Sequence, residues 1–62
     1  MEITFYELLG MIKDGNGPIE FIWKGLYWHK SGDYYFACNR EKMLNYFQIT
    51  DLSSKVRVLD NK

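Results

Sequence analysis

The residues that could do chemistry are few, and their spacing offers little support for catalysis. The chain of 62 residues has one histidine and one cysteine, His29 and Cys38. A thiol beside an imidazole can act as nucleophile and base, but the pair also needs a third group that orients the base. The sequence places no such group, so we expect a half-exposed histidine and a small buried thiol. The two residues also cannot supply the four ligands of a structural zinc site.

Four aspartates are the other candidates for chemistry, and all of them fall in expected turns or at the ends of expected elements. They are Asp14, Asp33, Asp51 and Asp60. Turn formation and capping account for such positions without any reaction. No pair has a spacing typical of general acid–base catalysis or of a cation-binding loop. The sequence therefore predicts a protein that is not an enzyme and has no metal and no cofactor.

The net charge of the chain and the length of its apolar runs argue against nucleic-acid and membrane partners. Eight basic residues balance eight acidic ones, whereas a nucleic-acid-binding domain usually shows a basic excess on one face. No apolar run approaches the 18 residues of a membrane-spanning helix. The opening Met1-Glu2-Ile3 has no basic segment of a signal peptide, and a lone thiol suits a reducing compartment. We expect one small domain over residues 1–62, located in the cytoplasm, with no membrane partner.

The first element that must position these residues is a helix from about Phe5 to Asp14. Thr4 and Glu7 have the spacing of a capping box, in which each side chain bonds the other's backbone N–H. Apolar residues then recur at i, i+3, i+4 and i+7, which is one stripe of a helix. That stripe is Phe5, Leu8, Leu9 and Ile12. Gly10 is the discordant residue, since glycine inside a helix is worse than alanine by about 1 kcal/mol; a close backbone approach is one reason for it.

After the turn residues 15–18 the apolar period changes to two, which predicts strands. Two-residue loops at Lys24-Gly25 and Ser31-Gly32 would fold residues 19–38 into an antiparallel three-stranded meander. Counting outward from each loop fixes the register. The first hairpin pairs Trp23 with Leu26, Ile22 with Tyr27, Phe21 with Trp28 and Glu20 with His29. The second pairs Lys30 with Asp33, His29 with Tyr34, Trp28 with Tyr35, Tyr27 with Phe36 and Leu26 with Ala37.

Neither face of this meander is polar, although an ordinary antiparallel sheet has one polar face. The first face collects Ile19, Phe21, Trp23, Leu26, Trp28 and Tyr35. The second face collects Glu20, Ile22, Tyr27, His29, Tyr34, Phe36 and Cys38. The first helix can cover only one face, so we expect it on Phe21, Trp23 and Trp28. Something else must cover the second face.

The remaining sequence predicts a short helix and a last strand. Asn39 is a candidate N-cap for a helix over residues 40–47, with Met43, Leu44 and Phe47 on its apolar side. Thr50-Asp51 and Ser53-Ser54 read as loop. Residues 55–59 alternate again and predict a strand at a sheet edge, where charged side chains would oppose pairing with another chain. The predicted fold class is α+β: a helix, an antiparallel three-stranded meander, a short second helix and a C-terminal strand.

Seven of the eleven aromatic residues lie between Phe21 and Phe36, and this concentration allows several interpretations. The second helix could cover the second face, since small folds need unusually dense cores. Alternatively that face binds a partner protein or a second copy, because tyrosine and tryptophan dominate interface hot spots. The predicted partner-binding residues are Ile22, Tyr27, His29, Tyr34 and Phe36. Single-stranded nucleic acid is a third possibility, disfavoured because Lys24 and His29 are offset by Glu20.

The stretch TFYELLGMIKDGNGPIEFIWKGLYW resembles small proteins of unassigned function that are encoded by phages and prophages of Gram-positive bacteria. The matching residues are Thr4, Tyr6, Glu7, Leu8, Leu9, Ile12, Lys13, Asp14, Gly15, Pro18, Gly25, Val56 and Val58. The family's first strand is more basic than residues 19–24, and its tail is more acidic than residues 55–62. The resemblance implies a phage accessory protein that binds and inhibits a host protein, such as a CRISPR nuclease or another defence enzyme. It assigns no active-site residues.

Overall fold

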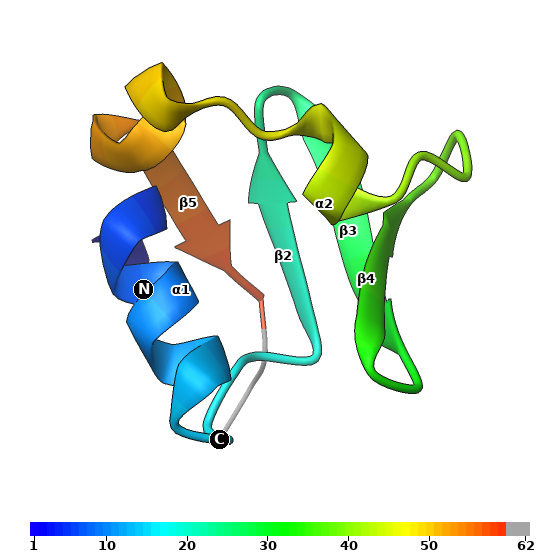
Figure 1. The fold of residues 1–62 in the computed structure, drawn as a ribbon, viewed down its shortest axis with the longest axis horizontal. Coiled ribbons are helices and arrows are strands. Elements are labelled where there is room, and N and C mark those ends of the chain that lie inside the picture. The colour runs from blue at the N-terminus through cyan, green and yellow to red at the C-terminus, as the bar shows by residue number, and fades with distance from the viewer. Residues whose placement is uncertain (60–62) are drawn as a thin grey trace.

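The computed structural model describes residues 1–59, in which helices lie on one side of a five-stranded antiparallel sheet (Figure 1). The strand order across the sheet is β1-β5-β2-β3-β4. The elements follow the chain as β1 (Glu2–Thr4), α1 (Phe5–Lys13), β2 (Glu20–Trp23), β3 (Leu26–Ser31), β4 (Tyr34–Ala37), α2 (Met43–Tyr46), a 3₁₀ helix η1 (Ile49–Ser53) and β5 (Lys55–Val58). The α+β class and the antiparallel pairing are therefore confirmed, while the sheet is larger than the sequence indicated.

Helix α1 begins where the capping box predicts. The Glu7 N–H donates to Thr4 Oγ1 at 3.1 Å, and the Thr4 N–H donates to Glu7 Oε1 at 2.8 Å. These two bonds satisfy backbone donors that a helix start leaves unpaired. The helix ends at Lys13, and Gly15 follows with a φ of 80°. Phe5 and Leu8 of the predicted stripe are fully buried.

The first hairpin has the predicted register, and the second does not. Lys24 and Gly25 both have positive φ, as a two-residue type I′ loop requires, and Phe21 faces Trp28. In the second hairpin the loop is Gly32-Asp33 and not the predicted Ser31-Gly32. Ser31 therefore belongs to β3 and faces Tyr34. Gly32 therefore takes the first loop position, with a φ of 64°.

The altered loop moves every pairing of the second hairpin by two residues. Lys30 faces Tyr35, His29 faces Phe36 and Trp28 faces Ala37, so the predicted pairing of Lys30 with Asp33 is wrong. Side chains alternate faces with a period of two, so a shift of two leaves each residue on its original face. The assignment of residues to the two faces therefore survives an incorrect register.

Strand β5 lies inside the sheet and not at the predicted edge. It pairs with β2 on one side and with β1 on the other. Residues 2–4 were too short a segment for their period to predict a strand, yet β1 forms the edge next to β5. The fully buried Val56 faces Ile3 and Trp23 across these two pairings. By pairing with both neighbours, β5 connects the N-terminal strand β1 to the meander.

The second helix is shorter than predicted. Helix α2 is a single turn whose N-cap is Lys42, and the 3₁₀ helix η1 replaces the expected loop after it. Asn39 does not cap the helix; its Oδ1 accepts the Glu41 N–H at 3.1 Å in a local turn. Leu44 was predicted on the buried side but is 66% exposed. The local turn at Asn39 therefore takes the place of the first turn of the predicted helix.

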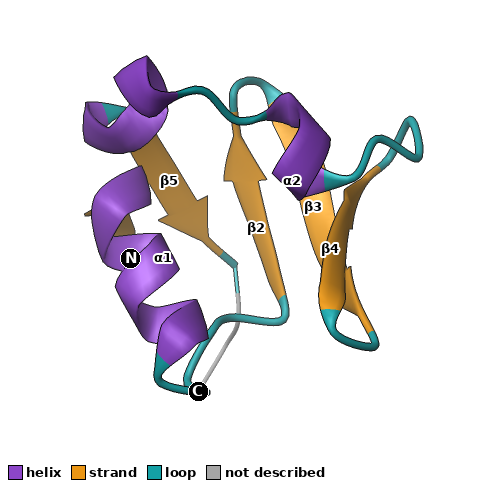
Figure 2. Ribbon diagram, viewed as in Figure 1, coloured by secondary structure: helices purple, strands orange, loops and turns teal. Residues whose placement is uncertain are grey.

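Both helices pack on the same face of the sheet, which Figure 2 shows with α1 and α2 in front of the strands. The Tyr46 ring of α2 lies 5.5 Å from the Trp28 ring, and Phe47 lies 5.2 Å from Phe5 of α1. Phe5 in turn stacks on Trp23 at 4.1 Å. The buried core is Phe5, Leu8, Phe21, Trp23, Trp28, Tyr35, Ala37, Met43 and Val56. Ile19, predicted to join this face, is 55% exposed because it precedes β2.

The polar atoms of the large core side chains all have partners. Trp28 Nε1 donates to the Trp23 carbonyl at 2.9 Å, and Trp23 Nε1 donates to Ser54 Oγ at 2.8 Å. The Tyr35 hydroxyl donates to the Pro18 carbonyl at 2.6 Å. Buried donors without partners are costly, so these bonds let a small core hold amphipathic aromatic side chains.

Candidate functional site

No element among residues 1–59 covers the face of the sheet opposite the helices. The interpretation that the second helix covers this face is wrong, since α2 lies on the core side. We call the uncovered surface the open face. Its apolar part contains all five predicted partner-binding residues, Ile22, Tyr27, His29, Tyr34 and Phe36. Ile22, Tyr27 and Tyr34 are 37–46% exposed, while His29 and Phe36 are half-buried by their neighbours.

Strand β3 supplies the central pair of this surface. The Tyr27 and His29 rings stack with centroids 6.2 Å apart and planes 21° from parallel. The Tyr27 hydroxyl donates to Glu20 Oε1 at 2.9 Å, and Glu20 is the cross-strand neighbour of His29. These contacts restrict the rotation of the tyrosine ring. A fixed aromatic ring loses little conformational entropy when a partner covers it.

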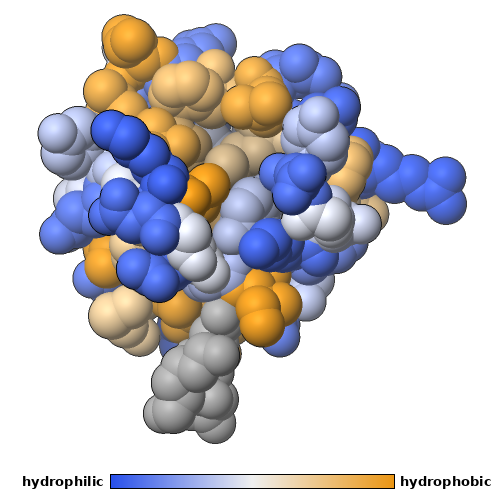
Figure 3. All heavy atoms as spheres, turned by 60° about the horizontal axis from the view of Figure 1, so that its bottom comes forward, coloured by the Kyte–Doolittle hydropathy of each residue, from blue (hydrophilic) through white to orange (hydrophobic). Residues whose placement is uncertain are grey.

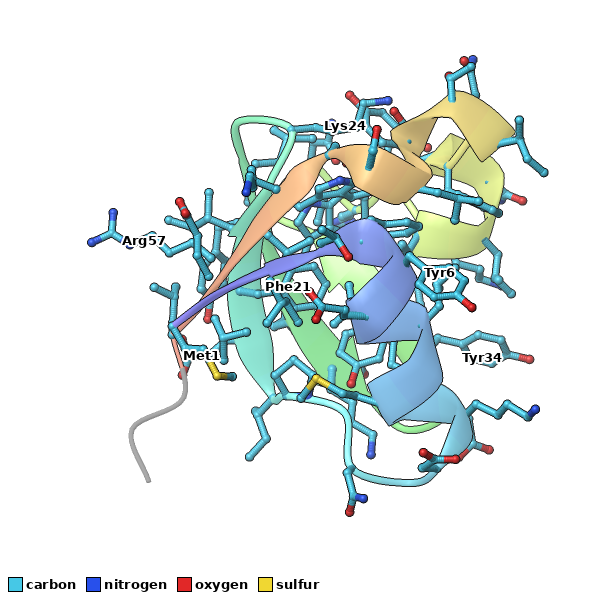
Figure 4. All side chains as sticks on the ribbon, turned by 90° about the vertical axis from the view of Figure 1, so that its left-hand side faces the viewer. Met1, Tyr6, Phe21, Lys24, Tyr34 and Arg57 are labelled. Atoms are coloured by element: carbon cyan, nitrogen blue, oxygen red, sulfur yellow. The ribbon has the colours of Figure 1, made fainter. Side chains whose placement is uncertain are left out.

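Strand β4 adds a second aromatic pair at an angle to the first. The Tyr34 and Phe36 rings meet edge to face at 6.5 Å, and Lys42 Nζ lies 4.4 Å from the Tyr34 ring centre. The sheet twists strongly, so β4 is seen nearly edge-on where β2 and β5 are seen flat (Figure 1). Tyr34 consequently points to the side opposite Arg57, the side on which Tyr6 of α1 also projects (Figure 4). The open face is a twisted surface and not a flat platform.

The half of the open face formed by β1 and β5 is charged, unlike the half formed by the meander, to which the prediction of two apolar faces applied. Arg57 faces Ile22 on one side and Glu2 on the other, and Lys55 shares its face. Arg57 projects away from the helices (Figure 4). Lys24, which the sequence placed here, instead binds Asp51 at 3.1 Å on the helix side. The apolar area is thus bordered on one side by charges of both signs.

His29 and Cys38 meet at a shallow hollow of about 410 Å³ beside this surface. Phe36, Ala37 and Arg40 complete its lining. The Cys38 thiol is exposed, so the predicted buried thiol is wrong. Within residues 1–59 no hydrogen bond links the thiol to the imidazole and no third group orients it, and a nucleophile–base pair requires both. The hollow can accept a side chain from a partner, but its geometry does not make a catalytic pair.

Sequence reasoning missed three apolar side chains on the helical layer that are more exposed than any on the open face. They are Tyr6 of α1, Leu44 of α2 and Ile49 of η1, at 66–76% exposure. Tyr6 was detectable, since it lies about 100° around the helix from the buried Phe5. Seen from the lower end of the molecule, apolar patches alternate with polar side chains (Figure 3). Exposed apolar area is therefore spread over more than one surface.

Folding lowers the pKa of the Asp51 carboxyl through two neighbouring groups. The Gln48 N–H donates to Asp51 Oδ2 at 2.9 Å and Lys24 Nζ lies 3.1 Å away, and both lower the pKa of this carboxyl. A carboxyl whose pKa falls on folding stabilises the protein above its unfolded pKa of about 3.9, and that stability is lost as the pH falls through the folded value.

We expect Asp51→Asn to be destabilising at pH 7 and to become less so as the pH falls below about 3.9 and through the lowered folded pKa, because the wild-type carboxyl then becomes protonated as well. Urea unfolding of both proteins at pH 7 and at pH 2 measures this difference. The matched control is Asp33→Asn in the second hairpin loop, which makes the same change of side chain away from Gln48 and Lys24. A stability difference for Asp51→Asn that persists unchanged at pH 2 would contradict the assignment.

Among the described residues, no three His, Cys, Asp or Glu side chains converge in a group that could hold a metal ion. No helix in the same part of the chain is long and apolar enough to cross a membrane. Comparison with known protein-family models, curated proteins and solved structures finds no match to any of them. The argument about function therefore depends on the open face and its chemistry.

Proposed function

We propose that this protein is a non-catalytic binding module whose open face holds a partner protein. The observation that carries the proposal is the packing of all helices on one face of the sheet, which leaves Ile22, Tyr27 and Tyr34 in solvent. Aromatic residues surrounded by a polar rim are the usual composition of an interface core. The charged border at Arg57, Lys55 and Glu2 suits such a rim.

Charge supports a protein partner over a nucleic acid. Arg57 and Lys55 on the open face are matched by Glu2 and Glu20, and the basic groups nearest the aromatic rings are two separate residues, Lys42 at Tyr34 and Arg40 at the hollow. Stacking of bases on aromatic side chains normally occurs in a positively charged groove. The hollow next to His29 would receive one protruding side chain of the partner.

The resemblance to phage-encoded proteins directs the search for that partner. We propose a bacterial host protein in the cytoplasm as the target, with inhibition of a defence enzyme such as a CRISPR nuclease as the outcome of binding. A second copy of this chain on the same face is the competing occupant, since it would bury the same apolar area.

Affinity capture from a bacterial lysate with matched variants tests the proposal. Wild type, Tyr27→Ala, Tyr34→Ala and the control Tyr6→Ala serve as bait, with quantitative mass spectrometry as readout. Loss of a hot-spot tyrosine weakens binding by about 2 kcal/mol or more, which is roughly 30-fold. We expect both open-face variants to lose the partner and Tyr6→Ala to keep it. If both open-face variants recover as much partner as wild type does, the open face is not the binding surface.

Two measurements separate the alternatives. A fluorescent oligonucleotide titrated at 50 and 200 mM salt should show no binding; a salt-dependent affinity would instead indicate phosphate contacts. Light scattering of Tyr27→Ala and wild type at high concentration tests self-association through the open face. A wild-type dimer that Tyr27→Ala abolishes would favour the second copy over the host protein.

A further inference from the structure

Strand β4 is followed by a tight hairpin loop, after which the chain returns toward α2 (Figure 1). The Ala37 N–H donates to the Glu41 carbonyl at 2.9 Å, and the Arg40 N–H donates to the Ala37 carbonyl at 2.8 Å. The loop therefore consists of residues 38–40. In hairpin loops of this length the last residue adopts a left-handed backbone conformation, for which glycine is best suited.

An arginine occupies this glycine position, since Arg40 has a φ of 71°. The left-handed region is unfavourable for a residue with a side chain, because its Cβ crowds the following carbonyl oxygen. Such a conformation persists only where the surrounding structure enforces it, and it occurs most often at binding and active sites. Here the two backbone bonds at Ala37 enforce it. The loop thus carries a guanidinium at a position where the backbone favours no side chain.

Arg40 lines the hollow of about 410 Å³ beside the open face, together with His29, Phe36, Ala37 and Cys38. Phe36 and Ala37 give the hollow its apolar surface. The guanidinium, the imidazole and the thiol can each donate a hydrogen bond. Within the described part of the chain, the lining of this hollow includes no carboxylate. The hollow therefore combines an apolar surface with donors and lacks an acidic group of its own.

A second cation lies on the same side of the sheet. Lys42 faces Phe36 across the hairpin, and directly opposed residues project to the same face. Its Nζ lies 4.4 Å from the centre of the Tyr34 ring. Glu41 instead pairs with the buried Ala37, so its carboxylate projects to the helix side. Among residues 1–59 the side chains of Arg40 and Lys42 have no ion-pair or hydrogen-bond partner, so both charges are available to a ligand.

We propose that the hollow binds a carboxylate side chain of the partner protein, in a segment that carries apolar residues beside the acid. This inference rests on the function proposed for the open face and names the chemistry of its partner. The Arg40 guanidinium matches the two oxygens of a carboxylate with two parallel N–H bonds. The His29 imidazole can donate a further bond from the opposite strand. Apolar residues of the segment would then cover Tyr27 and Tyr34.

An acidic protein segment fits this surface better than a nucleic acid does. Two cations beside one hollow match one or two carboxylates. A nucleic acid brings a phosphate with every nucleotide, and proteins hold such a strand in a basic groove that follows its backbone. On this face Glu20 is the cross-strand neighbour of His29, so the cations do not continue across the aromatic rings.

Selection from a displayed library of random short peptides tests the proposal, with wild type, Arg40→Gln and Lys30→Gln as bait. Lys30 is exposed on β3 and faces the buried Tyr35, so Lys30→Gln removes one positive charge away from the open face. Peptides selected by wild type and by Lys30→Gln should be enriched in aspartate or glutamate beside apolar residues. Peptides selected by Arg40→Gln should lack this enrichment. Acid enrichment that is equal for Arg40→Gln and wild type would overturn the assignment.

One selected peptide then measures the contact through a double-mutant cycle. Replacing its acidic residue by the matching amide should weaken binding to wild type by about 10-fold or more, as expected for a lost hydrogen bond to a charged group. The same replacement should weaken binding to Arg40→Gln by less than about 3-fold, because the guanidinium is already gone. Fluorescence anisotropy gives both affinities. Equal losses on the two proteins would show that Arg40 does not hold the carboxylate.

Arg40→Gly separates binding from stability. Glycine adopts the left-handed conformation readily, so the melting temperature should rise by a few degrees. Binding of the selected peptide should nevertheless fall by about 10-fold or more. A role of Arg40 in folding alone predicts no such opposition. A stabilised variant that binds the peptide like wild type would contradict the proposal.

The variant Tyr27→Ala distinguishes failure of this proposal from failure of the open-face function. Peptides that require Tyr27 but show no preference for acids would overturn the carboxylate site and leave the open face as the binding surface. Peptides that bind Tyr27→Ala as well as wild type, or a library without binders, would overturn both. A single-stranded oligonucleotide that binds wild type in a salt-dependent manner and fails to bind Arg40→Gln would assign the hollow to phosphate instead.

Discussion

Trp28→Ala is expected to unfold the protein at room temperature. Trp28 is fully buried, its ring contacts those of Phe21, Trp23 and Tyr46, and its indole N–H donates to the Trp23 carbonyl. Removal of a buried tryptophan side chain costs about 3–5 kcal/mol. A domain of 62 residues has a total stability of only about 3–9 kcal/mol. Circular dichroism and a proton–nitrogen correlation spectrum should show loss of tertiary structure.

The adjacent residue provides the matched control. Tyr27 lies in the same strand, directly before Trp28, but points to the open face, where its side chain is 41% exposed. Tyr27→Ala loses a cross-strand contact and the bond to Glu20, which amounts to about 1 kcal/mol or less. We expect this variant to remain folded at 25 °C. Similar melting temperatures for the two variants would contradict the assignment of faces.

Gly17→Ala is the second substitution with a large expected effect, a loss of about 1–3 kcal/mol through overpacking. A Cβ at Gly17 would lie 2.6 Å from the Tyr35 hydroxyl oxygen and 2.9 Å from Ile12 Cγ1. The Cα of Ile12 is also within 3.3 Å, so the backbone of α1 limits relaxation. Displacing Tyr35 would break its buried bond to the Pro18 carbonyl. Urea unfolding measures the loss.

A second glycine and a double-mutant cycle control this prediction. Gly10→Ala, measured at a few micromolar, should stabilise the protein by about 1 kcal/mol because its Cβ meets open space. Tyr35→Phe removes the oxygen nearest to the new methyl group. The double variant Gly17→Ala/Tyr35→Phe should therefore cost less than the sum of the two single changes. Additive effects would show that the hydroxyl is not the source of the clash.

The sequence by itself determined the local features and the division of the sheet into two faces. The capping box at Thr4, the stripe of α1 and the type I′ loop at Lys24-Gly25 depend on residues close in the chain. Face assignment depends only on the period of two, so it held even where the register of the second hairpin was wrong. All five predicted binding residues consequently lie on one face of the sheet, although its twist turns Tyr34 of β4 to the side opposite Arg57 (Figure 4).

Only the tertiary structure decided whether a helix covers that surface. The side of the sheet on which α2 packs depends on contacts of Tyr46 and Phe47 with rings far away in the sequence, and no local period encodes such contacts. The same holds for β5, whose central position follows from pairing with β1 and β2. Local chemistry fixed which way each side chain points along its strand. Long-range packing fixed which of those side chains stay in water, and so where a partner can bind.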